Sequence, residues 1–429
     1  MSSFIHELTM TTDPSNDTEV IIVGAGPVGL LLALGLGRAG IRTVVLEAHH
    51  ELLSTTRAVV YMPVVIPVLE RLGILDQVLS EAYLNKAGVV WRDIEGNTLA
   101  HLPLGSSDDA AFAGVLLLGQ WKMSEIILNE LKKYSSVKVK FGSRVVGIED
   151  EESAHAVSVM THSGSIVDED IFLSARYLVA TDGANSAIRR MLCIPFEGFT
   201  FQNFKMIGTD VLYDFMGKDN YSPLNFVVHK DHWAVLAYTG QNSQDDRGLP
   251  QWRVAYAEDP NLPSSKADYL ARAQKQLQKY ISAQDAQPHI IRAEPYLMQQ
   301  RVAAQPNKGR VYLCGDALHS NNPTGGLGLT GGILDAFCYS NAIRRVLREN
   351  AAETLMQDCA AARKSAWVDV TNKLSSDNIE RLYSVEPSIA RGRQAFFTKL
   401  NDAKTKQSVA AAVRASFNKM MPDDFSTSS

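Results

Sequence analysis

The feature that most constrains this chain is the glycine motif Gly24-Ala-Gly26-Pro-Val-Gly29 near the N-terminus. It follows the β-branched run Val20 to Val23, which is typical of a buried strand, and it opens an apolar stretch, Pro27 to Ala39, of helical length. A second β-branched run, Thr43 to Leu46, completes a βαβ unit. We therefore expect the chain to begin with a parallel nucleotide-binding sheet.

Each glycine of the motif has a separate physical role. Gly24 permits a tight turn, Gly26 lets the backbone approach a pyrophosphate, and Gly29 lets the helix pack closely on the strand. Unpaired amides and the positive end of the helix then stabilise the bound anion. Glu47 closes the second strand, about 20 residues further on, where a carboxylate can bind a ribose. These residues predict a dinucleotide site and leave FAD and NAD as alternatives.

Composition narrows the classes of function. The 429 residues carry 42 Lys and Arg against 47 Asp and Glu, a net charge of −5, which gives no basic excess for a nucleic-acid partner. The four cysteines show no CxxC pair and no Cys/His cluster at metal-ligand spacing, so we expect reduced thiols and no metal. The N-terminal sequence has no secretory pattern, and a dinucleotide turn explains the apolar run Val20 to Gly37 better than a transmembrane segment does. We expect a cytoplasmic protein of undetermined oligomeric state.

The periodicity changes along the chain. Val64 to Leu79 and Lys122 to Tyr134 have helical spacing, whereas short alternating strands from about Phe199 to Glu258 indicate an inserted antiparallel sheet. Arg310 to Cys314 restores a buried strand, and Thr330 to Leu347 is expected to form a long helix. Residues 351–429 also have helical spacing.

Two later segments carry further motifs. Asp182-Gly183-Ala-Asn-Ser186-Ala-Ile-Arg189 fits the pattern DGxxSxxR, and Gly315-Asp316 is followed by a glycine-rich run from Pro323 to Gly332. In this order the three motifs resemble those of the group A flavoprotein monooxygenases, the family of the para-hydroxybenzoate and salicylate hydroxylases. No second GxGxxG is present for a nicotinamide cofactor, as that family would predict.

The resemblance implies an α/β fold with three parts. These are a Rossmann-like FAD-binding domain of the glutathione-reductase type in residues 18–190 and 295–350, an inserted antiparallel β-sheet domain for substrate in residues 191–294, and a C-terminal helical segment in residues 351–429.

The resemblance also implies the residues that contact FAD. They are Gly24, Gly26, Gly29, Glu47, Arg57, Gln120, Asp182, Gly183, Arg189, Gly315, Asp316, Pro323, Gly326, Gly328 and Leu329. Asp316 is expected to bind the ribitol chain, and Arg189 has a solvated surface role as its alternative. His319 and Pro323 are candidate catalytic residues, although a hydrogen-bonded structural role is the alternative for His319. The sequence departs from the family at Leu318, within its common DAAH motif, and at Thr330, where Asn is frequent.

The implied activity is the hydroxylation of an aromatic, phenolic or related electron-rich small molecule with FAD, NAD(P)H and O2, through a flavin C4a-hydroperoxide. Candidates for the substrate pocket are Tyr213, His229, Trp233 and Tyr238, although aromatic residues in alternating strands more often pack the sheet. The alternatives are an epoxidase or other oxidoreductase on the same fold, and a non-catalytic binding protein of the same architecture.

Overall fold

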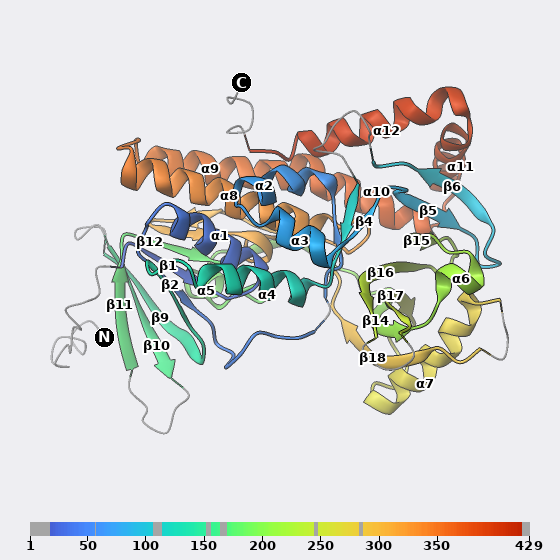
Figure 1. The fold of residues 1–429 in the computed structure, drawn as a ribbon, viewed down its shortest axis with the longest axis horizontal. Coiled ribbons are helices and arrows are strands. Elements are labelled where there is room, and N and C mark those ends of the chain that lie inside the picture. The colour runs from blue at the N-terminus through green and yellow to red at the C-terminus, as the bar shows by residue number, and fades with distance from the viewer. Residues whose placement is uncertain are drawn as a thin grey trace.

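The computed structural model of this chain describes residues 18–55, 57–105, 114–151, 156–163, 170–243, 248–282 and 286–422. Two sheet-based bodies lie side by side, and long C-terminal helices run across both of them (Figure 1). Among the helices within these ranges, none has the length and apolarity needed to cross a membrane.

The first body is built on a sheet with the strand order β20-β21-β12-β1-β2-β8. The strands from β21 to β8 pair in parallel, and β20 pairs antiparallel at the edge. β1, β2 and β12 are wholly buried, as expected of a parallel sheet covered on both faces. The strand bounds are β1 Val20–Val23, β2 Thr43–Leu46, β8 Val137–Lys140, β12 Tyr177–Ala180, β20 Asn307–Lys308 and β21 Val311–Leu313.

Helices and a β-meander cover the two faces of this sheet. On one face α1 (Pro27–Arg38) packs against α4 (Gln120–Leu131) and α8 (Leu327–Arg348). On the other face lies a three-stranded antiparallel sheet, which closes a second apolar core around Ile21, Val44 and Leu178. Its strands are β9 (Ser143–Glu151), β10 (Ala156–Ser163) and β11 (Asp170–Ala175).

The second body is a seven-stranded sheet in the order β18-β14-β17-β16-β15-β5-β6. It confirms the inserted antiparallel sheet, but it also takes β5 and β6 from the range predicted for the first domain, because β15 pairs in parallel with β5. Its strands are β5 Val89–Arg92, β6 Thr98–Leu102, β14 Lys205–Leu212, β15 Leu224–Val227, β16 Ala234–Asn242, β17 Pro250–Glu258 and β18 His289–Tyr296. The helices α6 (Phe215–Asp219) and α7 (Lys266–Leu277), with the short turn η4 (Gln278–Tyr280), accompany it.

Shorter elements join the two bodies. The helix predicted over residues 64–79 is divided into η1 (Pro63–Val65), α2 (Ile66–Arg71) and α3 (Leu75–Glu81), because Gly73 adopts a φ of 70° and ends the first part. Two three-stranded sheets have the orders β3-β7-β4 and β13-β19-β22. The remaining bounds are β3 Val60–Tyr61, β4 Tyr83–Asn85, β7 Val115–Leu117, α5 Ala187–Met191, β13 Phe196–Thr200, β19 Gln299–Ala303, η5 Gly315–Ala317 and β22 His319–Ser320.

The C-terminal part is helical, as predicted. It comprises α9 (Thr354–Ala366), the π-helical turn η6 (Trp367–Thr371), α10 (Asn372–Tyr383), α11 (Pro387–Asn401) and α12 (Ala403–Asn418). α9 packs on α8 in the first body and α11 packs on β6 in the second, so this segment spans both (Figure 1).

Candidate active site

The three sequence motifs converge at one edge of the parallel sheet. Gly24, Asp182 and Gly315 directly follow or lie within two residues of the carboxyl ends of β1, β12 and β21, which are neighbours in the sheet. In open α/β sheets ligands bind at this edge. The fold therefore brings together residues that are far apart in the sequence.

The three glycines of the first motif have different surroundings. Gly24 has a φ of 107°, and a Cβ on it would lie 2.6 Å from the Thr181 carbonyl oxygen. A Cβ on Gly29 would lie 2.1 Å from the Gly24 carbonyl oxygen, so both positions require glycine for packing. A Cβ on Gly26 would meet nothing within 4 Å. Open space therefore lies in front of the N-terminus of α1, where a pyrophosphate would bind.

Glu47 lies beside this loop. Its Oε2 accepts a hydrogen bond from the Ala25 amide at 2.8 Å, and its Oε1 accepts one from the His49 amide at 2.8 Å. The carboxylate is thus held in one orientation at the end of β2.

The second motif contributes a carboxylate with one free oxygen. Asp182 Oδ2 accepts from the amides of Ala187 and Ile188 at 2.7 and 3.2 Å, whereas within the described structure its buried Oδ1 has no hydrogen-bond partner. Desolvation raises the pKa of Asp182, against the opposing effect of the Ser186 side chain and of the backbone amides. The neighbouring Gly183 has a φ of 80°, and nothing lies within 4 Å of the position of a Cβ. A partnerless oxygen beside open space fits the edge of a site for a bound polar group.

Arg189 joins the second motif to the third. Its guanidinium donates to the carbonyls of Ala317 and Ala184 at 2.8 and 2.7 Å and lies 3.7 Å from the centre of the Phe196 ring. The residue is buried, so it is not a solvated surface charge. It holds the two loops together, and its direct contact with FAD stays a prediction.

The third motif presents an accessible acid. Gly315 has a φ of 60°, and the Asp316 side chain after it is exposed. The surrounding protein nevertheless desolvates this carboxyl and raises its pKa, while the charges of His319 and Arg57 act in the opposite direction. A side chain that is open to solvent and yet has protein atoms around it is expected on the wall of a concave site. Gln120 forms two hydrogen bonds with the backbone of Ala58, so it lies beside Arg57 on the same side of the site.

A buried charged cluster stands behind the third motif. Asp335 on α8 accepts from the Gly315 amide at 3.1 Å, from His319 Nε2 at 2.8 Å and from Arg363 Nε at 2.7 Å. Burial would raise the pKa of Asp335, but His319 and Arg363 outweigh it and the net change is downward. His319 is almost fully buried and stacks on Trp367, which supports its structural alternative, and its role in proton movement stays a prediction.

A polar network fixes the loop that carries Pro323. Gln300 Oε1 accepts from both the backbone and the side-chain amide of Asn322 at 3.1 Å, and Asn322 Oδ1 accepts from the Thr324 amide at 3.1 Å. Gln300 Nε2 donates to Ser375 Oγ on α10 at 2.8 Å. All four of these polar residues are buried, whereas Pro323 is exposed. The network therefore holds an exposed proline at the N-terminal side of α8.

The start of α8 completes the site. Gly326 caps the helix with a φ of 64°, and Gly328 and Leu329 lie half-buried in its first turn. Thr330, which stands where the family often has Asn, donates to the Gly326 carbonyl at 2.7 Å and accepts from the Met62 amide at 3.1 Å. Thr330 therefore links the glycine loop to the segment after β3 through these two hydrogen bonds.

The predicted substrate residues lie in the second body. Tyr213, Trp233 and Tyr238 are buried in aromatic packing, and the His229 ring stacks on His232. Trp233 faces α10, since it stacks on Tyr383. The contact of these four residues with substrate stays a prediction.

The sequence did not predict the roles of Asp335 and Arg363, nor those of the polar residues that fix the Pro323 loop. Asp335 had a weak signal, as a single acid inside an apolar helical stretch, whereas Arg363 is one of several basic residues in a helix and gave none.

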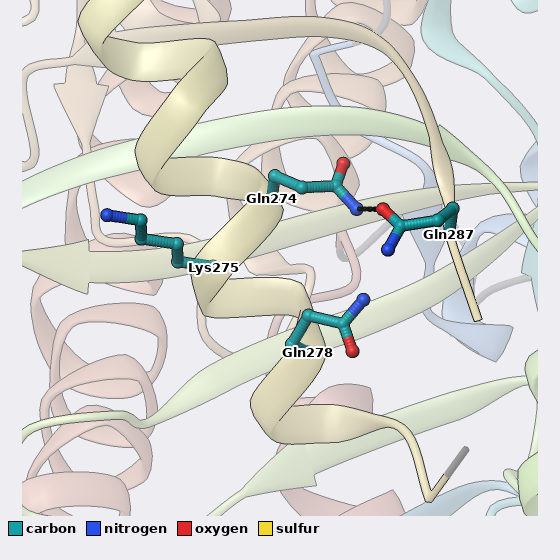
Figure 2. Close-up of a pocket in the computed structure, with 4 residues that line it drawn as sticks. All are labelled: Gln274, Lys275, Gln278 and Gln287. Atoms are coloured by element: carbon teal, nitrogen blue, oxygen red, sulfur yellow. Dashed lines mark hydrogen bonds between the residues drawn. The ribbon is translucent and has the colours of Figure 1, made fainter. Parts of the chain in front are cut away.

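A separate polar hollow lies on the second body. It is formed by Gln274, Lys275, Gln278 and Gln287, and Gln274 Nε2 donates to Gln287 Oε1 at 2.8 Å (Figure 2). None of the motif residues lines it. Within the described ranges, no group of three or more His, Cys, Asp or Glu side chains is placed to hold a metal ion.

Comparison with known proteins agrees with this geometry. The family model described as FAD binding domain matches residues 17–373. The para-nitrophenol 4-monooxygenase of Pseudomonas sp. (strain WBC-3) is 33% identical over 372 residues, which are 86% of this chain and 88% of that protein. The 6-hydroxy-3-succinoylpyridine 3-monooxygenase of Pseudomonas putida (strain DSM 28022) is 35% identical over 371 residues, 86% of this chain and 90% of that protein. The crystal structure of a p-nitrophenol 4-monooxygenase from Pseudomonas putida has a TM-score of 0.84 and 31% identity, and the match covers 94% of this chain and 98% of that one.

Proposed function

The chain belongs to the FAD-binding domain family and is an FAD-dependent aromatic monooxygenase of the group A flavoprotein type; from this membership we propose that its substrate is a phenol and its product the corresponding ring-hydroxylated compound. The structural observation that supports the FAD-dependent part of the proposal is the convergence of the three motifs around open space at Gly26 and Gly183 with the accessible Asp316 carboxylate beside it. A non-catalytic binding protein would have no need for this combination. The phenol is proposed from the substrate named for the para-nitrophenol 4-monooxygenase.

The proposed reaction consumes one phenol, one O2, one NAD(P)H and one proton. It yields the hydroxylated phenol, NAD(P)+ and one water, so that one oxygen atom enters a new carbon–oxygen bond and the other is reduced. Bound FAD supplies the redox chemistry that the protein side chains lack.

The residues of this chain bind and orient the cofactor. The amides after Gly24 and the N-terminus of α1 would hold its pyrophosphate, and the free oxygen of Asp182 would lie near the same region. Asp316 would accept hydrogen bonds from the hydroxyls of the ribitol chain. The positive N-terminus of α8 would stabilise negative charge on the reduced ring.

The same framework would help to exclude water from the reacting centre. The network of Gln300, Asn322 and Thr324 keeps the Pro323 loop in one conformation, and α10 lies behind it. The seven-stranded sheet would supply the facing wall for an aromatic substrate, which is the place where Tyr213, His229, Trp233 and Tyr238 are proposed to contribute. We propose further that the enzyme works in the cytoplasm.

The experiment is a panel of substituted phenols, including 4-nitrophenol, offered to the purified FAD-loaded protein. We expect NAD(P)H oxidation to be stimulated by at least one phenol, with a product heavier by one oxygen atom that takes up label from 18O2. Purified protein that fails to retain FAD, or NAD(P)H oxidation that yields only hydrogen peroxide with every phenol, would contradict the proposal.

A further inference from the structure

Cys338 on α8 and Cys359 on α9 form a pair of thiols that the mechanism above does not use. All four cysteines of the chain are free thiols, but these two share a side-chain hydrogen bond, so their sulfur atoms lie close together. Cys338 is half-buried and Cys359 is buried. The chain therefore has one partly accessible thiol with a second, shielded thiol directly beside it.

The packing of the two helices holds these thiols against each other. α8 and α9 lie side by side and are joined through residues 349–353, and a connection this short makes neighbouring helices antiparallel (Figure 1). Arg363 on α9 donates to Asp335 on α8 at 2.7 Å, which fixes the register of the pair. Cys338 lies one turn further along α8, and Cys359 lies one turn back along α9. The register of the salt bridge therefore also brings the two sulfurs face to face, as a disulfide requires.

The surroundings of the two sulfurs give them different reactivities. Burial raises the pKa of Cys359 well above its usual range, and the hydrogen bond with Cys338 acts in the same direction. Cys314, a third thiol close to Cys338, is fully buried, and burial raises its pKa as well. Of these three, Cys338 is the sulfur that solvent reaches. An oxidant in solution is therefore expected to react with Cys338 first and to leave Cys359 as the thiol that reacts second.

We propose that Cys338 and Cys359 form a reversible redox pair whose oxidant is hydrogen peroxide. A flavin monooxygenase that oxidises NAD(P)H without transferring oxygen converts one O2 and one proton into one hydrogen peroxide, so the oxidant arises from the enzyme's own turnover. The Cys338 sulfur attacks one peroxide oxygen, the oxygen–oxygen bond breaks and one water leaves, which yields a sulfenic acid. The Cys359 sulfur then attacks the Cys338 sulfur and a second water leaves. Two thiols and one peroxide thus give one disulfide, between α8 and α9, and two waters.

The pair would protect the helix that carries Asp335. An isolated cysteine that has formed a sulfenic acid can be oxidised further to a sulfinic acid, which thiol reductants do not reverse. On Cys338 the added negative charge would lie one turn from the buried Asp335 carboxylate, and like charges repel strongly where water is scarce. Formation of the disulfide stops the oxidation at a stage that a thiol reductant reverses.

The test treats the purified FAD-loaded enzyme with added hydrogen peroxide and maps the oxidation state of each cysteine by peptide mass. We expect wild type to form a Cys338–Cys359 cross-link, with the loss of two hydrogen atoms, and to return to both thiols with dithiothreitol. In Cys359→Ala, Cys338 should instead gain two oxygen atoms that dithiothreitol does not remove, and the thermal midpoint should fall below that of the untreated variant. Cys193→Ser removes an exposed thiol elsewhere on the chain and is the matched control, which should form the cross-link as wild type does.

A second arm replaces the added peroxide with NAD(P)H and O2 in the absence of a phenol. We expect the same cross-link in wild type, and we expect catalase to prevent it because catalase removes the peroxide. This arm needs the flavin reaction, whereas the first arm does not. Failure of the proposed function would appear as absent oxygenated phenol and leaves the result with added peroxide unaffected.

Several outcomes would overturn the inference. They are a wild type in which Cys338 reaches the sulfinic acid as readily as in Cys359→Ala, a cross-link from Cys338 to Cys314 instead, or a pair that stays reduced while the exposed Cys193 is oxidised. A cross-link that forms equally in the presence of catalase during NAD(P)H oxidation would overturn the assignment of peroxide as the oxidant.

Discussion

Two glycines of the first motif, three residues apart, differ in what surrounds them. A Cβ on Gly26 would enter open space, whereas a Cβ on Gly29 would lie 2.1 Å from the Gly24 carbonyl oxygen and 2.5 Å from Thr181 Oγ1. Gly26 also has an ordinary extended backbone, with a φ of −69°. The fold therefore requires glycine at position 29 but not at position 26, where the requirement for glycine is proposed to come from the ligand.

Substitution should separate these roles. Gly26→Val is expected to leave the thermal unfolding of the FAD-free protein within about 0.5 kcal/mol of wild type and to weaken FAD binding more than tenfold, because its side chain occupies the pyrophosphate space. Gly29→Ala is expected to destabilise the FAD-free protein by about 1–3 kcal/mol through overpacking. Calorimetry and fluorescence titration with FAD measure the two effects. Equal loss of stability in both variants would show that the open space at Gly26 is needed by the fold itself.

At the scale of elements, Asp335 joins α8, α9 and the turn after β21. Through Arg363, which donates to the Met420 carbonyl at 2.6 Å, the cluster also reaches the end of α12. Removing one charge of such a buried pair leaves the other without compensation, at a cost of about 3–5 kcal/mol, whereas an apolar pair of similar volume costs much less.

A double-mutant cycle tests this coupling. Asp335→Leu and Arg363→Met should each destabilise the protein by about 3–5 kcal/mol in urea unfolding at pH 7, and the double variant should lose clearly less than the sum. Because the net effect of its partners lowers the pKa of Asp335, its contribution is fully present above about pH 4 and is lost as the pH falls through the folded-state value. The wild type should consequently lose more stability below pH 4 than Asp335→Leu does. The coupling would be refuted if the double variant lost the sum of the two single losses of stability, or if wild type and Asp335→Leu lost stability in parallel as the pH falls.

The conformation of the loop around Pro323 depends on the buried hydrogen bonds of Asn322. Asn322→Ala removes the acceptor of the Thr324 amide and the side-chain donor to Gln300, both within a fully buried site, while the backbone amide of residue 322 still donates to Gln300. The variant should bind FAD several-fold more weakly and release more hydrogen peroxide per NAD(P)H, because the loop no longer holds one conformation over the ring. Ser375→Ala is the comparison, since Gln300 keeps its bond to Asn372 Oδ1 at 2.8 Å and the loop is not touched directly. An unchanged peroxide yield in Asn322→Ala would exclude this role for the network.

At the scale of the whole molecule, the features that could be predicted from the sequence are those that depend on residues close together in the chain. The βαβ unit, the inserted sheet and the long helix depend on residues within one window, and the motifs could be recognised because each occupies a single turn. The partners of Asp335 could not be predicted, since Arg363 lies 28 residues away and meets it only when α8 and α9 pack. For the same reason the bond from Gln300 to Ser375, and the joining of β5 to β15, appear only in three dimensions.

The C-terminal helices couple the two bodies, and this coupling can be tested as a unit. α11 places Phe397 and Leu400 in buried positions, Phe397 lies 5.7 Å from the buried Trp91 of β5, and Asn401 Nδ2 donates to the Leu99 carbonyl of β6 at 2.8 Å. Each large apolar side chain contributes about 1.5–3 kcal/mol when buried. Most of these contacts stabilise the seven-stranded sheet, whereas the FAD motifs belong to the other body.

A chain that ends after Tyr383 should therefore lose stability mainly in the second body. We expect a red-shifted tryptophan emission, because Trp91 becomes exposed, and a separate unfolding transition at lower temperature. FAD affinity should fall by less than tenfold, because Asp335 and Arg363 remain paired although the bond from Arg363 to the Met420 carbonyl is lost. A chain that lacks only residues 423–429 is the control and should match the full-length protein. If the shorter chain unfolds in one transition at the original temperature, the C-terminal helices do not couple the two bodies. If it loses FAD completely, α11 and α12 support the cofactor site more directly than these contacts indicate.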